Sequence, residues 1–276
     1  MTRTHRGYLM VWALLLACPG LAIAQNDLAR ARTLYNAEQF EEAIAAANSA
    51  RRRPAAVASA TLIIARSRLE RFRRLGDPQD LATARAELVS LNPGMLAPQE
   101  AIDWQIGVGT ALFLENQVGP ASEMFNSILQ VARTLLSAAE YEKLLEWWGA
   151  TLSRVAEGLT GDGRRQAYAR LHAVTKLELD RNPLSRPATY WTVVSSRGTG
   201  DFEEAWGAAV AGWIRAGDQA ESSSLRTDLE RFVMQTLIPE RAQARTGQRL
   251  DTKNTLGEIA VLNEEWRLVT GKWKKN

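Results

Sequence analysis

The chain has 276 residues, of which 46% are hydrophobic and 24% charged, and its formal net charge is +3 at pH 7. This length allows either one elongated array or two ordinary domains. The near balance of charge gives no sign of the strongly basic face that nucleic-acid binding requires, so we expect no nucleic-acid partner.

The first 24 residues resemble a secretory signal peptide. Arg3, His5 and Arg6 give a positive start, residues 9–16 form an apolar run, and an Ala-Ile-Ala cleavage sequence ends at Ala24. We therefore expect cleavage after Ala24 and a periplasmic or secreted mature protein.

Cys18 raises an alternative, because Leu-Leu-Ala-Cys at 15–18 resembles a bacterial lipobox, in which the cysteine is lipidated and becomes the new N-terminus. Pro19 follows directly and a further apolar stretch remains at 21–24, so lipidation is the rival interpretation. Cleavage after Ala24 removes Cys18, the single cysteine, and leaves His172 as the sole imidazole. The mature chain then has no thiol for a disulfide, a nucleophile or a metal ligand.

Beyond residue 26 the apolar spacing is helical almost throughout, and no segment alternates as a half-buried strand does. Apolar residues in 202–213 recur at the steps that form one helical face. Prolines directly after Asp77, Ala97, Gly119 and Arg186 stand at plausible first helical positions. Because short loops between amphipathic helices favour antiparallel neighbours, we expect an all-α fold of helical hairpins.

A Phe-Glu-Glu-Ala string occurs twice, at 40–43 and at 202–205, and small residues follow it each time. With its surroundings this pattern resembles the tetratricopeptide repeat, a 34-residue helix-turn-helix unit. Three segments supply the expected small and large residues in one register, whereas residues 135–182 read only as two longer helices. The matching residues are Ala31, Leu34, Phe40, Ala43 and Ala47 in the first segment, Gly109, Leu112, Ala121 and Phe125 in the second, and Phe202, Ala205 and Ala209 in the third.

The resemblance implies a right-handed superhelix of antiparallel hairpins, an α-solenoid, whose first helices line a surface for a protein or peptide partner. It predicts repeats in residues 25–134 and C-terminal helices in residues 221–276. Between them, residues 135–220 are expected to form degenerate hairpins, which include a repeat-like unit at 188–217. The family's clamp for a peptide carboxylate uses Lys and Asn, but the matching positions hold Leu28 and Arg32. That binding mode is therefore not expected.

An apolar stripe near the C-terminus predicts a helix that covers the last exposed face of the array. Its members are Ile259, Leu262, Trp266, Val269 and Trp273. The alternative is a docking helix for a partner or for an anionic membrane surface. Membrane contact is expected only through this helix or through lipidation of Cys18.

No motif points to catalysis. A hydrolase would need His172 as the general base for a serine, but the sequence has no G-x-S-x-G motif to supply that serine. Neither the H-E-x-x-H zinc motif nor the spacing of a calcium-binding loop occurs. We therefore expect no catalytic residue, no metal and no cofactor. A helical hydrolase that uses His172 or a pair of carboxylates is the least favoured alternative.

Two features are candidates for partner binding. Eight arginines lie between residues 51 and 74, opposed there only by Glu70, and Arg66 and Arg73 share a helical face. Such a patch would favour an acidic peptide, a phosphate or an anionic lipid, unless acids of adjacent helices pair with it.

Trp147 is the second candidate. Four other tryptophans, at positions 148, 206, 213 and 266, are in phase with buried faces, whereas Trp147 points about 100° away from its neighbour on the same helix.

The resulting hypothesis is an exported, non-catalytic protein interaction scaffold in a bacterial envelope assembly. The rival is a lipid-anchored structural component of the envelope.

Overall fold

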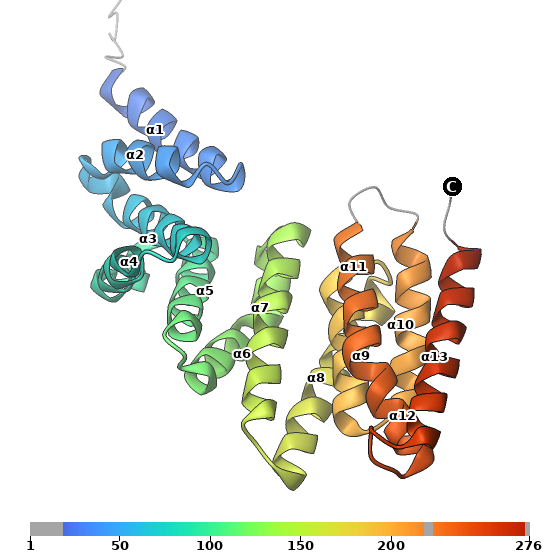
Figure 1. Ribbon diagram of the computed structural model, residues 1–276. Helices are drawn as coiled ribbons and strands as arrows, with labels where there is room; N and C mark the ends of the chain where they lie inside the picture. Colours follow the sequence, from blue (N-terminus) through green and yellow to red (C-terminus); the bar gives the residue numbers. More distant parts are fainter. Residues whose placement is uncertain (1–18, 218–222, 274–276) are drawn as a thin grey trace, which may run out of the picture. The chain divides into compact units, whose positions relative to one another are not determined.

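A computed structural model describes residues 19–217 and 223–273, with side chains for 27–217 and 224–273. Over these ranges the chain is helical and contains no strand (Figure 1), which confirms the all-α prediction for this part. The expected positive start, apolar run and Cys18 lie outside the described residues. The expected cleavage point after Ala24 falls within the first helix, α1 (Pro19–Asn36). No described helix is both long and apolar enough to cross a bilayer.

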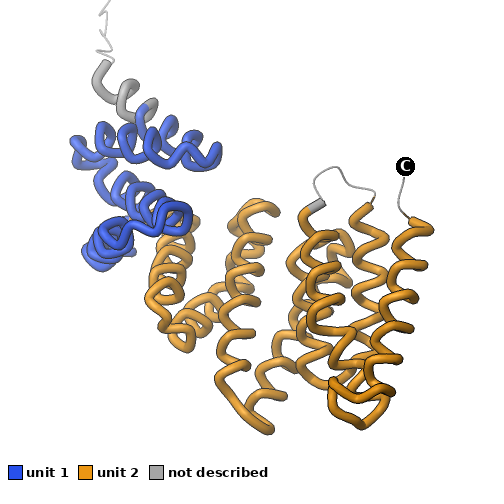
Figure 2. The backbone as a smooth tube through the Cα atoms, viewed as in Figure 1, with its two compact units in different colours: residues 1–95 blue, residues 96–276 orange. Residues whose placement is uncertain are grey.

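The chain forms two compact units, residues 1–95 and 96–276 (Figure 2). The boundary between the two units follows the Asn-Pro-Gly break at 92–94. It therefore falls inside residues 25–134, which the sequence analysis predicts to form one set of repeats.

The first unit contains α1, α2 (Phe40–Arg51), α3 (Val57–Leu75) and α4 (Pro78–Ser90), with short 3-10 turns η1 (Pro54–Ala56) and η2 (Pro93–Met95). Each helix packs on the next, and α1 also packs on α3. Alanines supply much of the contact, since Ala31, Ala43, Ala47 and Ala50 are fully buried. Their small side chains allow the helices of each pair to approach closely.

The second unit continues the pattern of sequential packing, with α7 also contacting α5 and α9, and α9 also contacting α11. Its elements are α5 (Pro98–Leu114), α6 (Val118–Leu135), α7 (Ala138–Glu157), α8 (Gly161–Arg181), α9 (Arg186–Thr199), α10 (Phe202–Ala216), α11 (Ser223–Phe232), a π-helical stretch η3 (Val233–Leu237), α12 (Ile238–Thr246) and α13 (Lys253–Lys272).

The three segments in repeat register share one type of closing turn. Glu38, Asn116 and Gly200 have φ values of 60°, 63° and 92°. In each turn the N–H of the following residue donates to the carbonyl oxygen five residues earlier, the bond that defines a Schellman motif. These bonds are Gln39 to Leu34 at 2.9 Å, Gln117 to Leu112 at 2.8 Å, and Asp201 to Ser196 at 2.9 Å. The second helix then begins at the next residue, so the local geometry places Phe40 and Phe202 at the same position of their hairpins.

In each hairpin we compare the residue seven positions before the left-handed turn residue with the residue nine positions after it. This pair has different side chains in the three hairpins. In the second hairpin a Cβ atom on Gly109 would lie 2.7 Å from Cε1 and 2.9 Å from Cζ of Phe125. The matching pair in the first hairpin is Ala31 with Ala47, both in one buried cluster. In the third it is Val193 with Ala209, again in one buried cluster. In each of the three pairs, at least one member is therefore glycine or alanine.

The tryptophans predicted in phase with the core are buried, at 0% exposure for Trp148, 7% for Trp206, and 2% each for Trp213 and Trp266. Trp266 of α13 packs edge-on against Trp206, with ring centroids 5.7 Å apart, and against Trp213 at 6.5 Å. Helix α13 thus packs its stripe on α10 and α12. Trp273, expected in the same stripe, is instead 55% exposed, because it lies beyond the end of α13.

Candidate partner-binding surface

Aromatic and carboxyl side chains from three helices of the second unit gather around Glu146. The indole N–H of Trp191, on α9, donates to Oε2 of Glu146, on α7, at 3.1 Å. The ring of Tyr190 stands at 84° to that of Trp191 with centroids 5.1 Å apart. It stands at 68° to Phe232 of α11, 5.9 Å away. We call Glu146, Tyr190, Trp191, Asp228 and Phe232 the Glu146 cluster.

Gly149 explains how Trp191 reaches Glu146. A Cβ atom at residue 149 would lie 2.5 Å from Nε1 of Trp191, so the indole rests where any larger residue would project. Gly149 follows Glu146 by three residues and therefore shares its face of α7. Trp191 is only 7% exposed, and its position is fixed by this contact. The carboxylate is thus held by a buried, well-packed donor.

The charges of the cluster are coupled. Burial raises the pKa of the Glu146 carboxyl, and the charge of Asp228 raises it further, whereas the Trp191 hydrogen bond and Arg186 lower it. Burial also raises the pKa of the Tyr190 phenol, with added contributions from Glu146 and Asp228. Water nevertheless reaches the Glu146 side chain, so its desolvation comes from surrounding helices and rings rather than from full enclosure.

Trp147, the expected contact aromatic, is half-buried on α7. Its ring lies edge-on to Phe113 of α5 at 5.3 Å and nearly parallel to Phe125 of α6 at 6.3 Å. Arg154 covers Phe113 at 5.4 Å. Trp147 therefore joins α7 to the preceding hairpin and leaves only part of its surface for a partner.

Arg66 and Arg73 belong to the first unit. The Arg66 guanidinium lies 4.8 Å from the centre of the Tyr35 ring, and Nη1 of Arg73 lies 2.6 Å from Oε2 of Glu70. Other arginines of the patch meet acids of neighbouring segments, namely Arg51 with Glu87, Arg68 and Arg71 with Asp80, and Arg74 with Glu38. These pairs agree with the alternative stated from the sequence, in which acidic side chains of the same protein pair with the arginines.

His172 of α8 contacts a group that sequence spacing did not reveal. Its Nδ1 lies 3.3 Å from Oγ of Ser196 on α9, and its Nε2 lies 3.4 Å from Oε2 of Glu204 on α10. Lys176 also pairs with Glu204, at 3.1 Å. The Ser196 hydroxyl is fully buried and lies 2.9 Å from the carbonyl oxygen of Thr192, to which it donates. This geometry favours a polar link between three helices over an accessible nucleophile.

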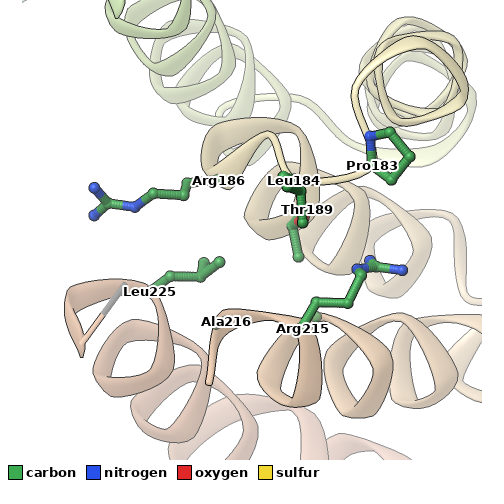
Figure 3. A pocket seen from close by; sticks show the side chains of 8 residues that line it. Pro183, Leu184, Arg186, Thr189, Arg215, Ala216 and Leu225 are labelled. Carbon is green, nitrogen blue, oxygen red and sulfur yellow. The ribbon is translucent and has the colours of Figure 1, made fainter. Parts of the chain in front are cut away.

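Two hollows lie elsewhere in the second unit. One, between the α8–α9 connection and the adjoining ends of α10 and α11, has a volume of about 10 Å³, room for a single water. Figure 3 shows Arg186 and Arg215 on opposite sides of it, with their guanidinium groups pointing apart. The other is a wide, open depression of about 530 Å³ beside Glu203, Arg241 and Arg245. Glu203 pairs with both arginines, at 2.5 Å and 3.1 Å.

Within the described ranges, no group of three or more histidine, cysteine, aspartate or glutamate side chains is placed to hold a metal ion. No family model, curated protein or solved structure matches the chain. The Glu146 cluster was not expected from sequence, because its members come from three helices and are separated by up to 86 positions, from 146 to 232.

Proposed function

We propose that the chain is an exported, non-catalytic scaffold of tetratricopeptide type that binds a protein or peptide partner in a bacterial envelope assembly. The observation that carries this proposal is the turn shared by the hairpins that close at Glu38, Asn116 and Gly200. One turn geometry, with small residues at matching contacts, is what a repeated helix-turn-helix unit requires.

The packing order supports an α-solenoid within the second unit. Helices contact their neighbours in sequence, and the first helices of successive hairpins, α5, α7, α9 and α11, also contact one another. In repeat proteins such nearest-neighbour contacts replace a single central core. We infer a right-handed superhelix in which α13, packed on α10 through Trp266 and on α12, covers the end of the array.

The proposed binding face lies on these first helices, where the Glu146 cluster joins α7, α9 and α11. It offers partly exposed aromatic rings, a residue type enriched at the centres of protein interfaces, beside two carboxylates. Export is supported by the signal-like sequence at 1–24.

A pull-down with matched variants tests the scaffold proposal. Tagged mature chain is cross-linked in an envelope extract, and recovered proteins are compared for the wild type and two double variants. Tyr190→Ala with Phe232→Ala removes the proposed face. Val131→Ala with Leu177→Ala removes half-exposed apolar side chains from the second helices α6 and α8.

We expect the same specific protein with the wild type and with the Val131/Leu177 variant, and its loss with the Tyr190/Phe232 variant. Circular dichroism confirms that each variant folds. Repeated recovery of no specific protein, or equal recovery by both variants, would contradict the proposal.

The N-terminus of the mature protein separates the two modes of export. Mass spectrometry of protein isolated from the envelope should find a chain that begins at Gln25. An acylated Cys18 at the N-terminus would instead establish the lipid-anchored alternative.

A further inference from the structure

The Glu146 carboxylate has no cationic partner among the described side chains. It accepts a hydrogen bond from the neutral indole N–H of Trp191, and no described lysine, arginine or histidine forms an ion pair with it. Other carboxylates among the described residues are paired with arginines, as Asp80, Glu178, Glu203 and Glu240 illustrate. Glu146 is therefore an accessible carboxylate that a neutral donor holds in place.

A chain of aromatic rings leads away from this carboxylate, from Trp191, which donates to it, through Tyr190 to Phe232 of α11. Tyr190 is steeply inclined to both Trp191 and Phe232, so neighbouring rings meet at a corner rather than in a stack. Tyr190 and Phe232 both keep part of their surface accessible to water. Ring faces attract cations through their quadrupole, and a carboxylate beside them adds a full negative charge.

We propose that the Glu146 cluster binds a lysine or arginine side chain of a partner's peptide segment, with Glu146 as the ion-pair partner and Tyr190 and Phe232 as the contacting rings. This inference rests on the proposed scaffold function and adds the chemistry of the partner. Trp191 serves as a positioning residue, since its N–H directs the carboxylate.

The charged groups around the cluster are compatible with a bound cation. Asp228 adds a second negative charge near Tyr190, although Arg231 lies 3.4 Å from it. The charge of Arg186 lowers the pKa of Glu146, and the Arg186 guanidinium donates a hydrogen bond to the hydroxyl of Ser224. A bound cation would thus lie near two carboxylates, of which Asp228 has Arg231 within 3.4 Å, whereas Glu146 accepts from the neutral Trp191 N–H.

Nuclear magnetic resonance of the indole N–H groups tests the site directly, because Trp191 donates to Glu146. The probe is an acetylated and amidated Gly-Arg-Gly-Arg-Gly peptide at millimolar concentration, with the citrulline peptide as its uncharged counterpart. We expect the arginine peptide to shift the Trp191 signal in the mature full chain and the citrulline peptide to bind about tenfold more weakly.

Two variants complete the experiment. Glu146→Gln keeps an oxygen for Trp191 but removes the charge, and should lose about tenfold in affinity for the arginine peptide. Glu230→Gln is the matched control, because it removes one exposed charge from α11 about 200° around the helix from Asp228. It should bind as the wild type does.

Equal binding of both peptides, unchanged binding by Glu146→Gln, or no binding of the arginine peptide overturns the cation site. The scaffold proposal is judged separately, by whether the Tyr190/Phe232 variant loses the cross-linked partner. If Glu146→Gln still recovers that partner in full, the partner binds this face without using the cation site.

Discussion

Replacing Gly109 by alanine should destabilise the second hairpin, although alanine is the better helix former. The added Cβ would lie 2.7 Å and 2.9 Å from two ring carbons of Phe125, well inside the 3.5–4.0 Å of an ordinary carbon contact. Phe125 is fully buried, so its ring has no free solvent side into which to turn. Overpacking costs about 1–3 kcal/mol, whereas alanine gains about 0.5–1 kcal/mol over glycine inside a helix. The midpoints of these two ranges leave a net loss of about 1 kcal/mol.

The same substitution should change sign once Phe125 is shortened. Phe125→Ala alone should cost about 3–5 kcal/mol through the cavity it leaves. In that background Gly109→Ala recreates the Ala31 and Ala47 pair of the first hairpin and should stabilise by about 0.5–1 kcal/mol. The difference between the two backgrounds equals the overpacking term, about 1–3 kcal/mol.

Urea unfolding followed by circular dichroism measures these free energies, and hydrogen exchange locates the change in α5 and α6. Gly207→Ala on α10 is the control, because nothing lies within 4 Å of its added Cβ. It should stabilise the protein equally in both backgrounds. The packing argument fails if Gly109→Ala destabilises the Phe125→Ala background as much as the wild type, or if it stabilises the wild type.

Three further predictions follow from local geometry and charge. Gly200→Ala should cost about 1–2 kcal/mol in thermal unfolding, because its φ of 92° is unfavourable for a residue with a Cβ; an unchanged midpoint would contradict this. Asp80→Asn should cost about 1.5–3 kcal/mol in urea unfolding, because the buried carboxylate bonds Arg68 at 2.9 Å and pairs with Arg71 at 3.2 Å; a loss typical of exposed sites would argue against it. Glu146→Gln should stabilise the protein at neutral pH. Because the folded pKa of Glu146 is raised, the ionised carboxylate destabilises the folded state, and this penalty disappears as pH falls through that pKa toward the ordinary value. The stability gap between variant and wild type should therefore narrow in acid, and a gap independent of pH would refute the assignment.

The features that the sequence predicted correctly are those set by local spacing. Helical periodicity identified the all-α fold and the burial of Trp148, Trp206, Trp213 and Trp266, because each depends on residues within one or two turns. The expected export signal and partner stay predictions.

The features that the sequence did not reveal depend on contacts between helices. The cluster at Glu146 requires α7, α9 and α11 to be side by side, and no spacing rule links residue 146 with residues 190 and 228. Pairing of the arginine patch likewise needed Asp80 and Glu38 from other segments. Trp273 continued the apolar spacing of its stripe, but the helix ends before it, so the expected contact is missing.

The shared turn has a consequence for how such a chain changes over time. Its defining hydrogen bond joins residues only five positions apart, and glutamate, asparagine and glycine all occupy its left-handed position. This backbone bond lies within a single hairpin, although arginines of the next hairpin also contact two of the turn residues, Arg74 at Glu38 and Arg154 at Asn116. We therefore expect in-frame duplication or deletion of a whole hairpin to leave the remaining hairpins correctly closed, so that length can evolve in modules while individual sequences diverge.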